Sequence, residues 1–217
     1  MNGFTTRDGV ELSYTDSGGG IPLVMLHGWG QTQAMFRHQV EGLARRVVTL
    51  DQRGHGVSAK PHHGYRIARL ARDAHELLDH LAIARADVLG WSMGVSVWWS
   101  FIDQFGTDRI RRFVAVDQPA AVAAVPWMSA QEQTDSGAIF DVAVLLGLGG
   151  ALAGPESAKA AEEFVRSMFS GEPTRRSGRS SRRRSRTPRR TRVCRCCGTT
   201  ARRTGATCSP ASTSPRS

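Results

Sequence analysis

The 217-residue chain has no acidic residue after Glu172 and no cysteine before Cys194. The segment 1–173 therefore has a formal net charge of −4, whereas the segment 174–217 has one of +14. The overall charge of +10 would by itself indicate an anionic partner, but the excess of positive charge is confined to the tail, residues 174–217. The cysteine-free part gives no indication of the redox compartment in which the protein works.

Long apolar runs are also missing. The first ten residues, MNGFTTRDGV, have neither the basic head nor the apolar run of a signal peptide. The longest apolar stretch, residues 138–153, is interrupted by Asp141 and by glycines, and it is too short to span a bilayer. We therefore expect a soluble, cytoplasmic protein.

Short apolar runs alternate with helical patterns along the first 119 residues, which predicts an α/β fold with a mostly parallel sheet. The predicted strands lie in residues 9–18, 21–30, 45–56, 86–94 and 110–119. Apolar residues at helical spacing predict helices over 65–81 and 95–105. Residues 120–170 indicate several helices and no clear strand.

The pattern Gly90-Trp91-Ser92-Met93-Gly94 stands where a buried strand passes into a helix. A G-x-S-x-G sequence in that context forces a sharp turn, which strains the serine backbone and projects its hydroxyl above the sheet. Helix N–H groups point at the same place, where an oxyanion would develop. A chance match in an ordinary turn is the alternative, but the flanking strand and helix favour a nucleophile.

A second glycine-rich turn, His27-Gly28-Trp29-Gly30, ends another buried strand. Its loop is placed to supply a further oxyanion donor, the backbone N–H of Trp29. We interpret His27 as a residue that makes hydrogen bonds within the loop. Asp51 and His55, in DQRGHGVS, are local to one loop whose glycines indicate tight backbone packing, so we do not expect His55 to be catalytic.

None of the seven histidines follows Ser92. A serine nucleophile normally takes its proton acceptor from a histidine, and an acid orients that histidine. Asp117, which ends the last predicted strand, is the only candidate acid. An acid with no histidine between it and the serine does not make a triad, so we expect this chain to be inactive.

Residues 3–172 resemble the α/β-hydrolase superfamily, and within it the bacterial cofactor-free haloperoxidase and esterase group. The motifs that carry the resemblance are HGWG, DQRGHGVS, GWSMGVSVWW and FVAVDQP. The resemblance implies an eight-stranded sheet with a helical cap after the sixth strand, Ser92 as nucleophile, and the amides of Trp29 and Met93 as oxyanion hole. It also implies a small ester-like substrate, with no metal or organic cofactor. The last two strands and the final helix have no counterpart here.

The tail, residues 174–217, contains fourteen arginines and no Lys, Asp, Glu or Phe. An Arg/Ser-rich segment of this kind is typically disordered and binds nucleic acid through phosphates. The CRCC sequence has poor spacing for tetrahedral zinc. We favour a frameshift after Pro173, since reading the tail one base back with G/C-rich codons yields balanced charges and tryptophans.

These observations divide the chain into a hydrolase core (1–119), a helical cap region (120–173) and a disordered tail (174–217). We expect a serine hydrolase that acts by ester hydrolysis or perhydrolysis through Ser92 and is inactive as this chain. The alternative is a non-enzymatic scaffold whose arginine-rich tail binds nucleic acid.

Overall fold

A computed structural model of the protein describes residues 1–167. The chain divides into two units, residues 1–173 and 174–217. All the described residues belong to the first unit. The disorder, the cysteine cluster and the frameshift that the sequence suggests for the tail lie outside the described residues.

The secondary structure begins with a hairpin, continues with alternating strands and helices, and ends in a run of helices. The strands are β1 (Asn2–Thr5), β2 (Glu11–Asp16), β3 (Leu23–Leu26), β4 (Val47–Leu50), β5 (Ala86–Trp91), β6 (Ile110–Val116), β7 (Ala123–Ala124) and β8 (Phe140–Asp141). The helices are the 3₁₀ turn η1 (Gln33–Phe36), α1 (Arg37–Gly42), α2 (Ile67–His80), α3 (Met93–Phe105), α4 (Ala130–Ser136), α5 (Val142–Ala153) and α6 (Ser157–Ser167).

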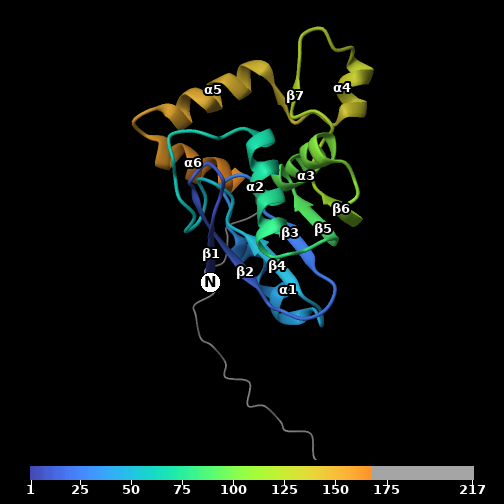
Figure 1. Ribbon diagram of the computed structural model, residues 1–217. Coiled ribbons are helices and arrows are strands. Elements are labelled where there is room, and N and C mark those ends of the chain that lie inside the picture. The colour runs from blue at the N-terminus through green and yellow to red at the C-terminus, as the bar shows by residue number, and fades with distance from the viewer. Residues whose placement is uncertain (168–217) are drawn as a thin grey trace, which may run out of the picture. The chain divides into compact units, whose positions relative to one another are not determined.

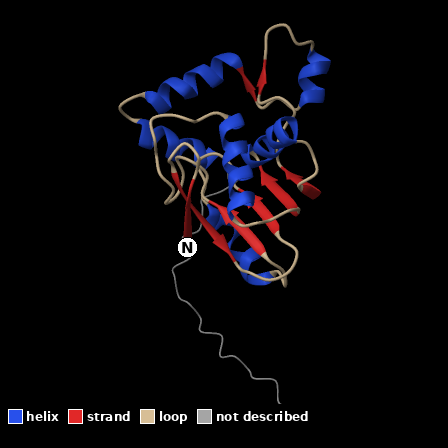
Figure 2. Ribbon diagram, in the orientation of Figure 1, coloured by secondary structure: helices blue, strands red, loops and turns tan. Residues whose placement is uncertain are grey.

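Six strands form one sheet in the order β1-β2-β4-β3-β5-β6 (Figure 1). The β1–β2 and β2–β4 pairs are antiparallel, and the β4–β3, β3–β5 and β5–β6 pairs are parallel. Figure 2 shows these strands as one twisted layer flanked by helices. The predicted mostly parallel α/β sheet is confirmed, and the carboxyl ends of β3, β4, β5 and β6 meet at one edge, where such sheets bind ligands.

The central strands β3 and β4 are buried at every position because helices cover both faces of the sheet. On one face, Val24 and Leu26 belong to the main core with Trp98 and Phe101 of α3. Helix α2 joins this core through a stripe of buried residues at helical spacing, which is why it packs here.

The opposite face is covered by η1 and α1, which the sequence analysis did not predict. Leu23 and Met25 of β3 form a smaller buried cluster with Phe36. Leu89 and Trp91 of β5 pack against this cluster but are only partly buried. This face of the sheet is therefore less completely covered than the other.

A buried ion network ties α2 to the loop after β4. The Arg53 guanidinium has no exposed side-chain surface and makes a bidentate pair with Asp73, with distances of 3.0 and 2.9 Å. It also contacts Asp8, and Arg69 joins Asp8, Asp73 and Glu76. The hydrogen bond from Arg53 is the main cause that holds the pKa of Asp8 well below its usual range. This network fixes the loop 51–58 beside the sheet's carboxyl edge.

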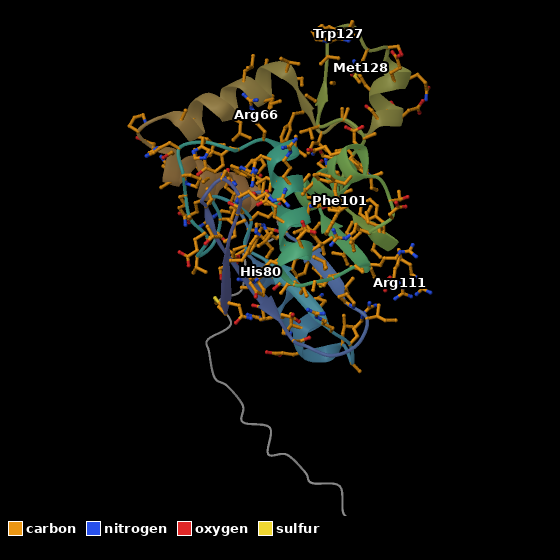
Figure 3. The ribbon with its side chains drawn as sticks, viewed as in Figure 1. Arg66, His80, Phe101, Arg111, Trp127 and Met128 are labelled. Carbon is orange, nitrogen blue, oxygen red and sulfur yellow. The ribbon has the colours of Figure 1, made fainter. Side chains whose placement is uncertain are left out.

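The region after residue 119 is helical, as predicted, but it also contains two short strands that the sequence analysis missed. Two residues of β7 pair in parallel with two of β8. Helix α4 begins with a capping box between Ser129 and Glu132. Trp127, before α4, is 83% exposed and points away from the rest of the region in Figure 3. No helix in residues 1–167 is long and apolar enough to cross a membrane.

Candidate active site

Ser92 occupies the junction between β5 and α3. Its backbone dihedrals, φ 49° and ψ −122°, lie in a region that residues with a side chain rarely adopt. The next residue, Met93, begins α3. A strained serine between a buried parallel strand and a helix is the arrangement that projects a hydroxyl from the carboxyl edge of a sheet.

The two glycines of the motif make this turn possible because the backbones approach too closely for a side chain. A Cβ on Gly90 would collide with the backbone of Gly94 and Val95. A Cβ on Gly94 would collide with the carbonyl oxygen of Leu26, at the end of β3. The two glycines therefore allow α3 to pack closely on β5 and β3.

The loop after β3 lies directly against the serine. The position that a Cβ on Gly28 would take is 3.3 Å from Ser92 Cβ and 3.1 Å from Trp91 Cδ1. The N–H groups of Trp29 and Met93 have no hydrogen-bond partner among residues 1–167. A free amide in the loop after β3 and another at the first residue of α3, both close to one serine, suit the binding of an anionic oxygen.

The Trp29 side chain reaches the helical region after residue 119, a contact that sequence reasoning missed. Its ring packs edge-to-face on Phe164 of α6, with centroids 5.3 Å apart and an interplanar angle of 75°. Phe164 in turn lies 6.1 Å from the ring of Phe140 in β8. No local sequence signal identifies this pair, because Phe164 lies 135 positions after Trp29.

His27 is fully buried, and both of its ring nitrogens are engaged. Nδ1 donates to the Gly28 carbonyl at 2.8 Å, and Nε2 accepts from the Gln52 amide at 3.1 Å. Burial lowers the pKa of His27 to about 4, so the ring stays neutral. The histidine therefore joins the β3 and β4 loops, which agrees with the structural role expected of it.

Asp51 and His55 likewise serve the loop that contains them. Asp51 accepts hydrogen bonds from the backbone amides of Gln33 and Val57, at 2.7 and 3.0 Å. Gly56 packs so closely on this carboxylate that a Cβ would collide with it. The Nδ1 atom of His55 bonds to the Arg53 carbonyl at 3.0 Å. These contacts organise backbone, as the glycines of DQRGHGVS indicated.

Asp117 follows β6 directly and has a left-handed backbone, with φ 55°. The preceding residue, Val116, accepts the backbone N–H of Ser92 at 2.8 Å. The backbone at Asp117 is therefore held next to the serine, although its side chain is exposed. No group of three or more potential metal ligands is present in residues 1–167.

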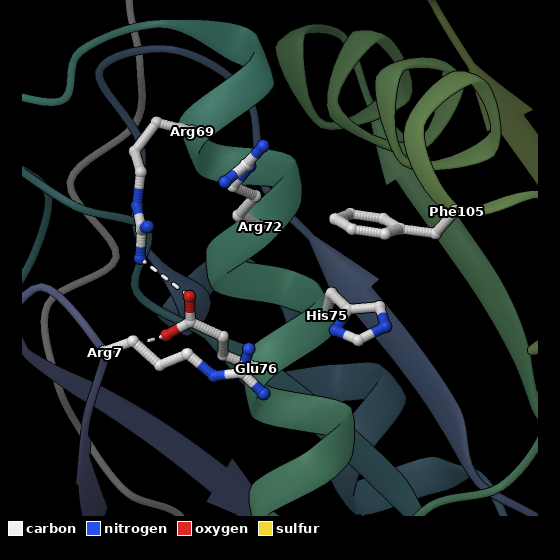
Figure 4. A pocket seen from close by; sticks show the side chains of 6 residues that line it. All are labelled: Arg7, Arg69, Arg72, His75, Glu76 and Phe105. Atoms are coloured by element: carbon white, nitrogen blue, oxygen red, sulfur yellow. Dashed lines mark hydrogen bonds and ion pairs between the residues drawn. The ribbon is translucent and has the colours of Figure 1, made fainter.

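Two cavities are relevant to the choice of site. One, of about 450 Å³, shares the Trp29 loop with Ser92. The other, of about 280 Å³, is lined by Arg7, Arg69, Arg72, His75, Glu76 and Phe105 (Figure 4). In the second cavity Glu76 accepts bonds from Arg69 and from the Arg7 amide, and none of the lining residues belongs to the loops around Ser92. The first cavity therefore borders the loop that contacts Ser92, although Ser92 itself lines neither cavity.

A mostly parallel sheet in which one central strand ends at a strained serine before a helix defines an α/β-hydrolase type of scaffold, and we call its turn at the serine the elbow. The chain belongs to the alpha/beta hydrolase fold family, whose sequence model matches residues 21–186.

Relatives with several activities share this fold. The non-heme chloroperoxidase CPO-A1 of Kitasatospora aureofaciens is 34% identical over 113 residues, which cover 51% of this chain and 41% of that protein. A soluble epoxide hydrolase of Corynebacterium is 38% identical over 112 residues, 51% of this chain and 39% of the relative. The crystal structure of a bromoperoxidase from Bacillus anthracis superposes with a TM-score of 0.67 at 27% identity, covering 77% of this chain and 60% of that one. The chain thus spans about two fifths of the curated relatives it matches.

Proposed function

We propose that this chain carries the nucleophile and the oxyanion-binding half of a serine hydrolase site for small ester-like substrates. Ser92 attacks the carbonyl carbon, and the amides of Trp29 and Met93 hold the oxygen that becomes negative. The observation that carries the proposal is the strained, positive-φ backbone of Ser92 between β5 and α3, with two glycines packed beneath it. Strain of this kind persists only where the surrounding structure enforces it.

The residue type at the elbow favours acyl transfer over epoxide opening, although relatives named for both activities match the chain. A carboxylate that opens an epoxide forms an ester, which water can hydrolyse. A serine oxygen that opens an epoxide would form an ether, which water does not cleave under mild conditions. A serine that attacks an ester or peracid carbonyl forms an acyl-enzyme, which water or peroxide can release.

Among residues 1–167, no histidine is placed as a proton acceptor for Ser92. His27 has both ring nitrogens occupied, and His55 bonds to the Arg53 carbonyl. No hydrogen bond within residues 1–167 joins any of the other five histidines to Ser92. Ser92 therefore keeps the reactivity of an ordinary alcohol. Loss of a triad member lowers turnover by roughly 10⁴–10⁶ and leaves only what the oxyanion hole and binding supply.

The test is base rescue with free imidazole. Turnover of p-nitrophenyl acetate by the purified chain should rise with imidazole concentration beyond the rise seen with Ser92→Ala. The subtraction of the Ser92→Ala rate removes hydrolysis by imidazole itself. A burst of p-nitrophenol equal to the enzyme concentration would identify the acyl-enzyme. Equal rates for both proteins at every imidazole concentration would show that Ser92 is not the nucleophile.

A further inference from the structure

The 450 Å³ pocket beside the serine loop has features that the proposed acyl transfer does not use. It is lined by Trp29, Gly30, Gln31, Thr32, Gly54, His55, Gly56, Lys60 and Tyr65. None of these lining residues, all within the described part of the chain, is acidic. The pocket shares only the Trp29 loop with Ser92, so its occupant and the reacting ester need not be the same molecule.

Lys60 supplies the positive charge of the pocket. Its ammonium donates to the carbonyl oxygens of Gly56 and Ser58, at 2.8 and 3.3 Å. An ammonium has three protons to donate, and no carboxylate pairs with this one in residues 1–167. Asp51, which lies beneath Gly56, already accepts the amides of Gln33 and Val57. The cation is thus held in place by uncharged groups and keeps one donor for a ligand.

Aromatic side chains form the walls. The Tyr65 ring lies so close to Gly54 that a Cβ there would collide with it, although 55% of the residue stays exposed. Trp29, 39% exposed, is braced by Phe164. His55 is braced by its bond to Arg53 and lies with its ring 5.1 Å from that of His27. Planar rings held from behind are suited to stack on a planar ligand.

We propose that this pocket binds a small aromatic anion, with its ring between Trp29 and Tyr65 and its negative group on Lys60. The charge requirement follows from Lys60, and the preference for a planar ring follows from the walls. This inference concerns binding alone, so it stands or falls independently of turnover at Ser92.

The chain offers a direct test because Lys60 and Lys159 are its only lysines. The probe is para-fluorobenzenesulfonate, and the neutral comparison compound is para-fluorobenzenesulfonamide. Reductive methylation followed by mass spectrometry reports the reactivity of each lysine. The sulfonate should slow methylation of Lys60 and leave Lys159 unchanged, since Lys159 is 69% exposed and pairs with Glu156 instead. The sulfonamide should protect Lys60 less.

Fluorine NMR titration of variants completes the test. Lys60→Met keeps the length of the side chain and removes its charge, and it should weaken sulfonate binding roughly three- to fivefold, as expected for an exposed ion pair. Sulfonamide binding should not change, and Lys159→Met should change neither. Tyr65→Ala should weaken both compounds. Equal protection of both lysines, or sulfonate binding that survives Lys60→Met unaltered, would overturn the proposal.

Discussion

The backbone N–H of Ser92 donates to the carbonyl oxygen of Val116 across a distance of 2.8 Å. This bond extends the β5–β6 ladder to the elbow and joins the strained serine to the end of the neighbouring strand. It has two consequences. The Ser92 amide itself is occupied, so it is not available to an anionic oxygen. The chain after Val116 also turns beside the serine, which places the backbone of Asp117 at the carboxyl edge of the sheet.

Gly94→Ala should destabilise the fold by roughly 1–3 kcal/mol, because the added Cβ would collide with the Leu26 carbonyl and push α3 away from β3. The free energy of unfolding, measured in urea at low protein concentration, reports the loss. The matched control is Gly147→Ala in α5, where an added Cβ meets nothing within 4 Å. That substitution should be neutral or stabilise by up to about 1 kcal/mol, because glycine is a poor helix former. Equal effects at the two positions would contradict the packing described for the elbow.

Stability should fall as the pH drops from about 6.5 towards 4, because His27 is buried and neutral in the folded state. The unfolded chain binds a proton near the ordinary pKa of histidine, whereas the folded chain does so only near its lowered pKa of about 4. This difference in proton binding lowers the free energy of unfolding by roughly 3 kcal/mol at the lower end of the range. Above 6.5 both states are neutral and the effect vanishes.

The measurement is the free energy of unfolding of wild type and His27→Gln across that pH range. The variant should be less stable at neutral pH, since it loses the bonds to Gly28 and Gln52, but its stability should depend less on pH. Asp8, Asp16 and Asp79 have lowered pKa values, so their own contributions are lost at more acidic pH. A variant with the same slope as wild type would show that His27 is not the titrating group.

Phe164→Ala should loosen the loop that carries the Trp29 amide. The edge-to-face pair is worth roughly 0.5–1.5 kcal/mol, and the loop itself contains Gly28 and Gly30, which give it little rigidity of its own. Hydrogen exchange of residues 28–31 should accelerate several-fold. Leu146→Ala, on a cap residue that is 71% exposed, is the control and should leave this exchange unchanged. If Phe164→Ala leaves it unchanged too, the cap does not position the loop.

Local signals in the sequence were enough to identify the elbow and strands β2 to β6, but not β1. Gly90 and Gly94 flank the serine at fixed spacing, and the fully apolar run of β3 indicates a strand covered on both faces. The helix α1 was missed because Arg37–Gly42 has no buried residue and therefore no apolar stripe. The strands β7 and β8 were missed because each has only two residues. The Trp29–Phe164 contact and the Lys60 pocket depend on long-range packing, which no local pattern records.

The last prediction concerns β6, the outer strand of the six-stranded sheet. One edge of this strand has no partner in residues 1–167, and its middle presents Val114, which is 48% exposed. Only Arg111 and Arg112, at its start, carry charge. An open apolar edge is a template for pairing with another chain. We therefore expect the protein to self-associate at micromolar to millimolar concentrations.

Val114→Lys should shift light scattering and gel-filtration profiles towards monomer, because a charge on an edge strand opposes such pairing. Val57→Lys is the control: Val57 is 66% exposed but lies in a loop, so the same charge there should leave association unchanged. Equal improvement from both variants would mean that net charge, not the β6 edge, governs association.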